Sequence, residues 1–456
     1  MPRALLLLLL VLWPAAGGRG DGLTTASFLA GFALPGLAVA VTVRRARRSA
    51  AWRRATRRVL LAGEVGLLVA VGWLGVGLIW FGWAGTVRAW VPGWWGIGAL
   101  RPVVGVTPVL VGWAVVWAAA HPAWEVAAGR TMLERVEAGL PVRRFPSRWR
   151  FVAGEMRDRV LVLLAPVTVL LMLRDVLRRA GLAAGWSADV AEAVGVGGGV
   201  VAVLLLGPVV LRRVLRTRPL PAGELRERLE ALVATSGVRV RRLLLWDTDF
   251  QRPNALALGL VRPTRYVLLS DALIELLSDR QLDAVLAHEL GHVRHRHLVW
   301  LLSLGLGLML IVWGPASRAD QWVLARLPAG VAEVAAWGTV ALTLLLVALA
   351  FTAAARAYER EADRFAHRVA GQGDDEAVPA IAEALAVVTA TPEGPPRVRV
   401  GPAGWLLDVL GNPMHGSTRQ RVAALRDPRR IDRNARIART ATAAVLLLGL
   451  LSLPWA

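Results

Sequence analysis

Continuous apolar runs alternate along the chain with short segments rich in arginine. Most of these runs approach or reach the roughly 20 residues that a helix needs to cross a bilayer, although 160–173 is short for a span. We expect membrane-spanning helices over 25–43, 59–82, 103–120, 160–173, 194–211, 298–313, 331–354 and 441–456.

The pattern changes between residues 212 and 278, where apolar residues recur at helical or alternating spacing instead of in unbroken runs. A helix is expected around 225–233, followed by strands over 240–246, 254–260 and 265–269. A compact α+β unit is therefore expected among the membrane helices.

Membrane insertion explains the composition and charge of the chain. Hydrophobic residues make up 55% of it, and its net charge of +21 comes from arginine alone, because lysine does not occur. A balance this basic could indicate nucleic-acid binding, but the arginines cluster beside the apolar runs, at 44–58, 143–159 and 421–439. The positive-inside rule and anionic lipid headgroups explain that clustering, so we expect the lipid bilayer, and no nucleic acid, as a partner.

Residues 278–297 combine the signature of a helix with residues that bind metals. Ser278 and Gln281 form a capping box, and apolar residues recur behind them at helical spacing. His288 and His292 are four residues apart, so on a helix both imidazoles project from one face and can bind one metal ion. The alternative is a pair of surface histidines near a basic membrane edge, but a glutamate bracketed by two of the chain's seven histidines favours the metal site.

Zinc is the metal that this H-E-x-x-H pattern favours. The chain has no cysteine, which excludes thiolate ligands and leaves histidine and carboxylate. Zinc with two imidazoles, one further protein ligand and an open position lowers the pKa of a bound water to about 7. Glu289, next to the first histidine, can take the proton of that water as a general base. We therefore expect one Zn²⁺ per chain, held by His288, His292 and a third ligand.

Carboxylates in the segment 356–365 offer that third ligand. Glu359 and Asp363 share one helical face, where like charges four residues apart destabilise a helix unless something uses them. Zinc ligation by Glu359, with Asp363 hydrogen-bonded to one of the metal ligands, is such a use. Glu361 lies about 200° around the helix from Glu359 and is expected to point away from the two histidines. The alternative is a solvated face held together by three arginines, Arg356, Arg360 and Arg364.

Four motifs in this order resemble the membrane-embedded zinc metalloproteases of the HtpX and CAAX-prenyl-endopeptidase type. The resemblance covers residues 223–426, with a departure at Gly416, where the family usually has proline. The motifs are the strand Asn254-Ala255-Leu256-Ala257, the helix with His288, Glu289 and His292, the pair Glu359 and Asp363, and finally His415 with Arg421.

The resemblance also implies roles for residues other than the metal ligands. Residues 254–257 would be the strand edge on which an extended substrate binds, although a plain core hairpin fits the same pattern equally well. His415 and Arg421 would face the zinc and stabilise the oxyanion of the substrate carbonyl, although Arg421 alone could be one more membrane-edge arginine. His295 and His297 lie past the zinc pair and are expected to belong to the basic membrane edge and not to the ligand set.

Together these observations predict a mainly α fold of polytopic transmembrane helices with a small α+β zincin-like metalloprotease domain. Residues 1–18, a basic start before an apolar core, are either a signal-like segment or a first span. A multi-span membrane region is expected over 19–211. The metallopeptidase domain is expected over 212–440, interrupted by spans at 298–313 and 331–354, and a C-terminal span over 441–456.

The expected function is that of an integral membrane zinc endopeptidase that cleaves membrane or membrane-associated proteins. Its expected location is a bacterial inner or plasma membrane, with the catalytic domain on the cytoplasmic side, where the positive-inside rule places the arginine-rich segments. Two alternatives are a sensor-transducer similar to the β-lactam receptor metalloproteases, which relays a signal by proteolysis, and a non-catalytic scaffold that contains zinc. Glu289 argues against the scaffold, because a purely structural zinc site has no use for a general base.

Overall fold

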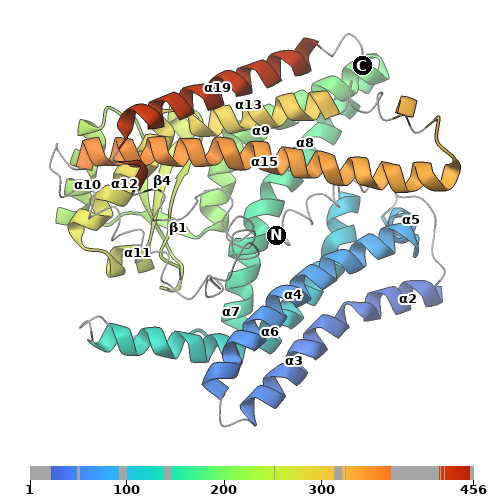
Figure 1. Cartoon of the computed structure of the whole chain (residues 1–456), viewed down its shortest axis with the longest axis horizontal. Coiled ribbons are helices and arrows are strands. Elements are labelled where there is room, and N and C mark those ends of the chain that lie inside the picture. Colours follow the sequence, from blue (N-terminus) through green and yellow to red (C-terminus); the bar gives the residue numbers. More distant parts are fainter. Residues whose placement is uncertain are drawn as a thin grey trace.

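The computed structural model describes residues 22–48, 52–91, 100–137, 145–250, 252–312, 321–323, 325–370, 421, 423–425 and 427–451. Helices dominate this part of the chain, and one small sheet lies beside them (Figure 1). The expected mainly α architecture with a small α+β unit is confirmed.

The first helices form a bundle with an aromatic core. Phe28 is fully buried, and its ring centroid lies 5.2 Å from that of Phe32 and 6.2 Å from that of Trp73. The indole of Trp113 donates a hydrogen bond of 2.9 Å to the backbone carbonyl of Leu67, so its polar group is satisfied inside the bundle. The bundle contains α2 (Gly22–Gly31), α3 (Ala33–Arg47), α4 (Trp52–Ile79), α5 (Trp83–Trp90) and α6 (Leu100–Glu137).

A long helical hairpin connects this bundle to the sheet. Its first arm contains α7 (Arg148–Glu155), the π-helical turn η3 (Met156–Leu161) and α8 (Val162–Ala183), and its second arm is α9 (Ala188–Val214). At Gly195 a Cβ atom would lie only 2.7 Å from the carbonyl oxygen of Arg174. Glycine is therefore required at this close approach of the two arms.

Six helical segments in the described ranges are long and apolar enough to cross a membrane, as expected for a multi-pass protein. The short run at 160–173 is the middle of a 36-residue helical segment, so it is not a short span. The last span begins earlier than 441, because the arginine-rich residues before it continue the same helix. The six segments are Thr25–Arg47, Arg58–Leu78, Arg101–Gly129, Arg148–Ala183, Ala188–Val214 and Pro428–Leu451.

The compact unit is built on a four-stranded sheet of order β1-β2-β4-β3. Strands β2 and β4 are parallel, whereas β3 pairs with β4 antiparallel and lies at an edge. The helices α10 (Glu224–Thr235), α11 (Asp271–Leu276) and α12 (Asp279–Arg294) accompany it. The strands are β1 (Thr217–Pro219), β2 (Arg242–Trp246), β3 (Ala255–Leu258) and β4 (Tyr266–Ser270); the sequence analysis did not anticipate β1.

Apolar positions of α12 bury that helix against the sheet and position the site. Leu282, Leu286 and Leu290 recur at four-residue spacing and lie in the core with Val267 and Leu269 of β4. Burying each such leucine contributes about 1.5–3 kcal/mol to stability, so the face of α12 that carries the two histidines is fixed in rotation.

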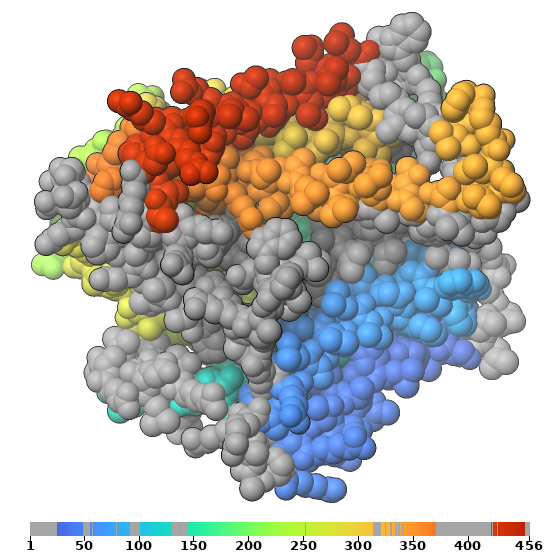
Figure 2. Space-filling view, in the orientation of Figure 1, coloured from blue at the N-terminus to red at the C-terminus, as the bar shows by residue number. Residues whose placement is uncertain are grey.

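Three helices complete the unit, namely α13 (His297–Ile311), α15 (Ala329–Ala370) and α19 (Pro428–Leu451). The first part of α19 lies against the end of α15, and α13 lies between these two helices farther along (Figures 1 and 2). At Gly291 of α12, a Cβ atom would lie 3.0 Å from Cα of Ala362 in α15. A glycine between the two histidines therefore lets α12 approach α15 closely enough for their side chains to meet.

Candidate active site

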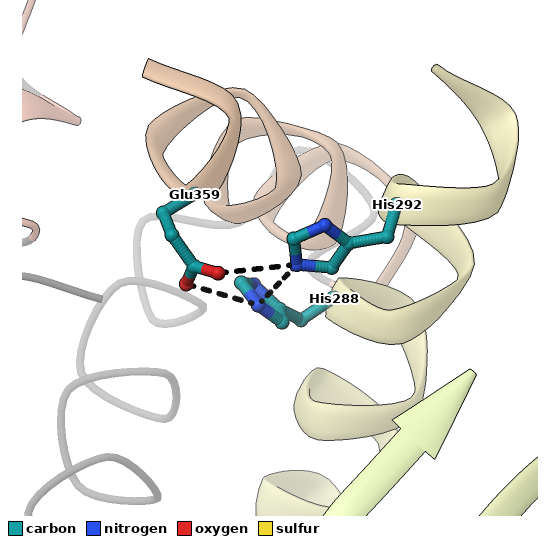
Figure 3. A group of neighbouring side chains, drawn as sticks. All are labelled: His288, His292 and Glu359. Carbon is teal, nitrogen blue, oxygen red and sulfur yellow. Dashed lines mark hydrogen bonds and ion pairs between the residues drawn. The ribbon is translucent and has the colours of Figure 1, made fainter. Parts of the chain in front are cut away.

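Helix α12 presents His288 and His292 side by side, as the sequence predicts. The capping box is complete: the Ser278 hydroxyl accepts from the backbone N–H of Gln281, and the Gln281 side chain accepts from the backbone N–H of Ser278. The Nε2 atoms of His288 and His292 lie 3.1 Å apart (Figure 3). Both imidazoles thus direct a ring nitrogen toward the same point.

Glu359 of α15 closes the third side of this point. Its Oε2 lies 3.6 Å from Nε2 of His288, and its Oε1 lies 3.5 Å from Nε2 of His292 (Figure 3). A tetrahedral zinc ion with bonds of about 2.0–2.1 Å holds its ligands about 3.3 Å apart, close to these separations. Two imidazoles and a buried carboxylate therefore fit a zinc ion in both chemistry and spacing.

Asp363 lies one turn after Glu359 and supports His288 from behind. Its Oδ1 lies 2.9 Å from Nδ1 of His288, and its side chain is fully buried. Arg421 binds the same carboxylate with two hydrogen bonds, from Nε to Oδ2 at 2.8 Å and from Nη2 to Oδ1 at 2.5 Å. The hydrogen bond to Asp363 fixes His288 with Nδ1 protonated and Nε2 free to ligate a metal.

The charges of Asp363, His288 and Arg421 shift the pKa of Asp363 downward and that of His288 upward. Burial alone would raise the pKa of Asp363, but the positive charge and hydrogen bonds of Arg421 hold it below its usual value. Burial alone would lower the pKa of His288, but the hydrogen bond and charge of Asp363 raise it above its usual value. Asp363 is therefore a stable anion beside a histidine that attracts either a proton or a metal ion.

Arg421 lies in the site, where it contacts carboxylates and its Nη2 also lies 3.4 Å from Nδ1 of His288. Besides binding Asp363, its Nη1 lies 3.5 Å from Oε2 of Glu359, and it is buried. The negative charge of Asp363 and Glu359 raises the pKa of Arg421 against the opposing effect of burial. An oxyanion role for Arg421 stays a prediction, and His415, its expected partner, lies outside the described residues.

Glu289 connects the metal group to the edge strand. Its Oε2 accepts a hydrogen bond of 3.0 Å from the backbone N–H of Ala257 in β3. Ala257 pairs with Val267 of β4 on the other side, so this N–H points away from the sheet. Asn254 begins the strand, where its backbone N–H donates to the Ser270 hydroxyl at 2.9 Å. The expected strand edge and the expected base thus lie in contact.

Comparison with known proteins assigns this part of the chain to a family. Residues 219–429 match the family model described as peptidase family M48. We call residues 219–429 the M48 domain, after the family that they match. The chain is 36% identical over 104 residues to a protease HtpX homolog of Aeropyrum pernix, covering 22% of this chain and 32% of that one. It is 27% identical over 157 residues to a CAAX prenyl protease 1 homolog of Oryza sativa subsp. japonica, covering 32% and 37%.

The matched regions thus span about a third of the length of these relatives. The crystal structure of S. mikatae Ste24p aligns over 86% of this chain and 98% of that chain, with 13% identity and a TM-score of 0.38. The helices before β1 and most of α19 lie outside the M48 domain.

One expectation about the M48 domain is wrong. His297 does not lie at an exposed basic edge: it is 1% exposed, and its ring stacks on Tyr358 with centroids 4.7 Å apart. Its Nδ1 lies 2.9 Å from Nδ1 of His292, and its Nε2 lies 3.0 Å from Oε2 of Glu361. His295, only partly exposed, also faces Glu361, with Nδ1 3.4 Å from Oε1.

Glu361 points away from the metal group, as expected, yet it is buried and reaches His292 through His297. Helical periodicity did not reveal this contact, because residues five apart on one continuous helix face different directions. Arg296, with φ of 55°, lies between α12 and α13 and turns the chain so that His297 lies back under His292. This left-handed conformation is disfavoured for an arginine and leaves no signal in the sequence.

Proposed function

We propose that this protein is an integral membrane zinc endopeptidase. The observation that carries the proposal is the convergence of three donors, from His288, His292 and Glu359, directly beside a glutamate that contacts an edge strand. When bound by these residues, zinc acidifies a water molecule and polarises a carbonyl group. The membership of residues 219–429 in peptidase family M48 supports a peptide as the substrate.

Glu289 acts in this proposal as the general base. It accepts the proton of the attacking water and passes it to the leaving amine of the cleaved peptide bond. Its carboxylate is hydrogen-bonded to the outer edge of β3, and a bound peptide would lie along this edge. A non-catalytic scaffold would need no carboxylate at this place.

The edge of β3 binds the substrate in this proposal. An extended peptide can add to an exposed strand through backbone hydrogen bonds, which do not depend on side-chain sequence. The outward N–H of Ala257 is the donor for a substrate carbonyl, and it exchanges Glu289 for the substrate on binding. This exchange would release the base at the moment when a peptide arrives.

Asp363 and Arg421 orient the ligand His288, and Arg421 lies close enough to the metal group to stabilise negative charge on the substrate carbonyl. Substrates in this proposal are membrane or membrane-associated proteins, because Glu359 follows the apolar stretch of α15 and the apolar helix α13 begins just past His292. The M48 domain is assigned to the cytoplasmic side of a bacterial inner membrane, and the metallopeptidase unit to residues 212–440.

The proposal is tested with the purified protein and its Glu289→Gln variant in detergent. Both are incubated with an unfolded test protein, and cleavage is followed over time. The variant should keep its fold and metal but lose hydrolysis by several orders of magnitude, because only the base is gone. Undiminished cleavage by Glu289→Gln would exclude the proposed mechanism.

A further inference from the structure

Behind the second candidate ligand lies a group that the proposed mechanism does not use. His297 begins α13, and its ring is enclosed by Tyr358 on one face and by His292 at its edge. A buried imidazole needs partners for both nitrogens, and both are present: His292 at Nδ1 and Glu361 at Nε2. Glu361 in turn accepts a hydrogen bond from Arg439 of α19.

The tautomers of these rings follow from one requirement. If Nε2 of His292 is to ligate a metal, its proton must sit on Nδ1. That N–H donates to Nδ1 of His297, 2.9 Å away, which must then be unprotonated, so His297 carries its proton on Nε2. This N–H donates to the Glu361 carboxylate at 3.0 Å. Each hydrogen bond thus has one donor and one acceptor, with no conflict along the chain of groups.

His288 and His292 are each supported by a carboxylate that is bound by an arginine. His288 is held directly by the carboxylate of Asp363, which Arg421 binds. His292 is held by His297, then by the carboxylate of Glu361, which Arg439 binds. The inserted imidazole makes the second chain longer, because Glu361 lies on the side of α15 that faces away from the metal group.

We propose that His297, Glu361 and Arg439 form a positioning chain that fixes the tautomer and ring orientation of His292. This inference rests on the proposed metal function, since a tautomer matters only to a ligand. Three helices contribute to the chain: α13, α15 and α19. Arg439 lies beyond the residues that match the family model, so α19 joins the metal site of the M48 domain through this contact.

Four substitutions separate a positioning role of His297 from a packing role. His297→Leu fills the space but removes the acceptor for His292. His297→Asn places an amide oxygen near the position of Nδ1 and restores an acceptor. His295→Leu is the matched control, because it removes an imidazole that stacks on His297 and faces Glu361 but leaves the acceptor for His292 in place. Glu361→Gln weakens the hold on His297 while keeping side-chain size.

The test measures binding of cobalt(II), as a coloured substitute for zinc, to the purified full-length chains in detergent. His297→Leu should bind the metal about 10- to 100-fold more weakly than wild type and show an altered visible spectrum. His297→Asn should recover most of the affinity, and His295→Leu should match wild type. If His297→Leu does not fold, the comparison of Glu361→Gln with His295→Leu decides, with weaker binding expected only in the former.

The outcomes distinguish failure of the metal site from failure of the positioning chain. A wild-type protein that binds no metal overturns the metal site and the positioning chain with it. A wild-type protein that binds cobalt, with His297→Leu of equal affinity and spectrum, overturns the positioning chain alone. Equal losses in His297→Leu and His297→Asn also overturn it, because they indicate a packing role.

Discussion

The carboxylate of Glu289 accepts a hydrogen bond of 3.0 Å from the backbone N–H of Ala257. One residue of the H-E-x-x-H helix is thereby tied to the edge of the sheet. In the proposed function this N–H serves the substrate when a peptide is bound, so its loss should affect binding more than the chemical step.

Ala257→Pro tests this role of the strand edge. Proline removes the outward N–H but no hydrogen bond to β4, so the sheet ladder should persist. We expect a higher KM for unfolded protein substrates and an unchanged metal content. Ala255→Pro is the comparison at the same edge: the N–H of Ala255 donates to Oδ1 of the neighbouring Asn254 at 2.9 Å and not to Glu289, so its loss should raise KM less. Equal effects of the two substitutions on KM would argue against substrate binding at Ala257.

Asp363→Asn should weaken metal binding without emptying the site. The variant keeps a hydrogen-bond acceptor for His288 but loses the negative charge, and such partners typically change affinity by about 10- to 100-fold. Metal affinity is measured by competition with a chromogenic chelator. Asp283→Asn, on the side of α12 where Arg228 binds, is the control and should match wild type. A wild-type affinity in Asp363→Asn would contradict the role assigned to this carboxylate.

Stabilisation by zinc should increase with pH. In the metal-free protein the pKa of His288 is raised. Protonation of His288 therefore stabilises the fold at a pH below the usual pKa of histidine, and this stabilisation is lost as the pH rises through the raised pKa. Zinc needs the neutral ring and must displace that proton. The rise in Tm on adding zinc should therefore be larger at about pH 8 than at about pH 6. Magnesium should give no such rise, because it prefers oxygen ligands. A zinc effect that falls with pH would contradict this account.

Arg252→Ala should destabilise the junction between the helical hairpin and the sheet. Arg252, just before β3, binds Glu155 of α7 and lies 3.5 Å from Asp158 of η3, and all three side chains are largely buried. Removing one partner of a buried pair costs about 3 kcal/mol, which a lower Tm in detergent would report. Arg150→Ala is the control at the same junction: Arg150 binds Asp249 but is 68% exposed, so its loss should cost at most about 1 kcal/mol. Equal Tm values for the two variants would mean that the buried network contributes nothing.

The orientation in the membrane can be tested by labelling, because the chain has no cysteine. Single cysteines are introduced at two exposed positions, Ala184 in the turn between α8 and α9 and Thr235 at the end of α10. If the M48 domain is cytoplasmic, an impermeant thiol reagent should label Ala184→Cys in spheroplasts and Thr235→Cys only in inverted vesicles. The reverse pattern would overturn the proposed sidedness.

Local periodicity predicted the parts of the site that lie within one helix. The capping box of α12, the common face of His288 and His292, and the register of Glu359 and Asp363 all follow from spacings of three or four residues. These relations need no knowledge of tertiary structure, since helix geometry alone sets them.

Contacts that depend on packing could not be predicted in the same way. His297 reaches His292 only because Arg296 breaks the helix, and Arg439 meets Glu361 only because α19 packs beside α15. Arg252 and Glu155 are almost a hundred residues apart in sequence. From the sequence alone, His297 and Arg439 were expected at the basic membrane edge, and Arg252 carried no prediction.

The most direct test of the central claim is the metal content of three purified proteins: wild type, Glu289→Gln and Glu359→Ala. Each is dialysed against metal-free buffer, and zinc per chain is measured by elemental analysis. The account predicts one zinc in wild type and in Glu289→Gln, whose ligands are intact, and none in Glu359→Ala, which lacks the third ligand. A wild-type protein without zinc, or a Glu359→Ala variant that retains it, would contradict the account.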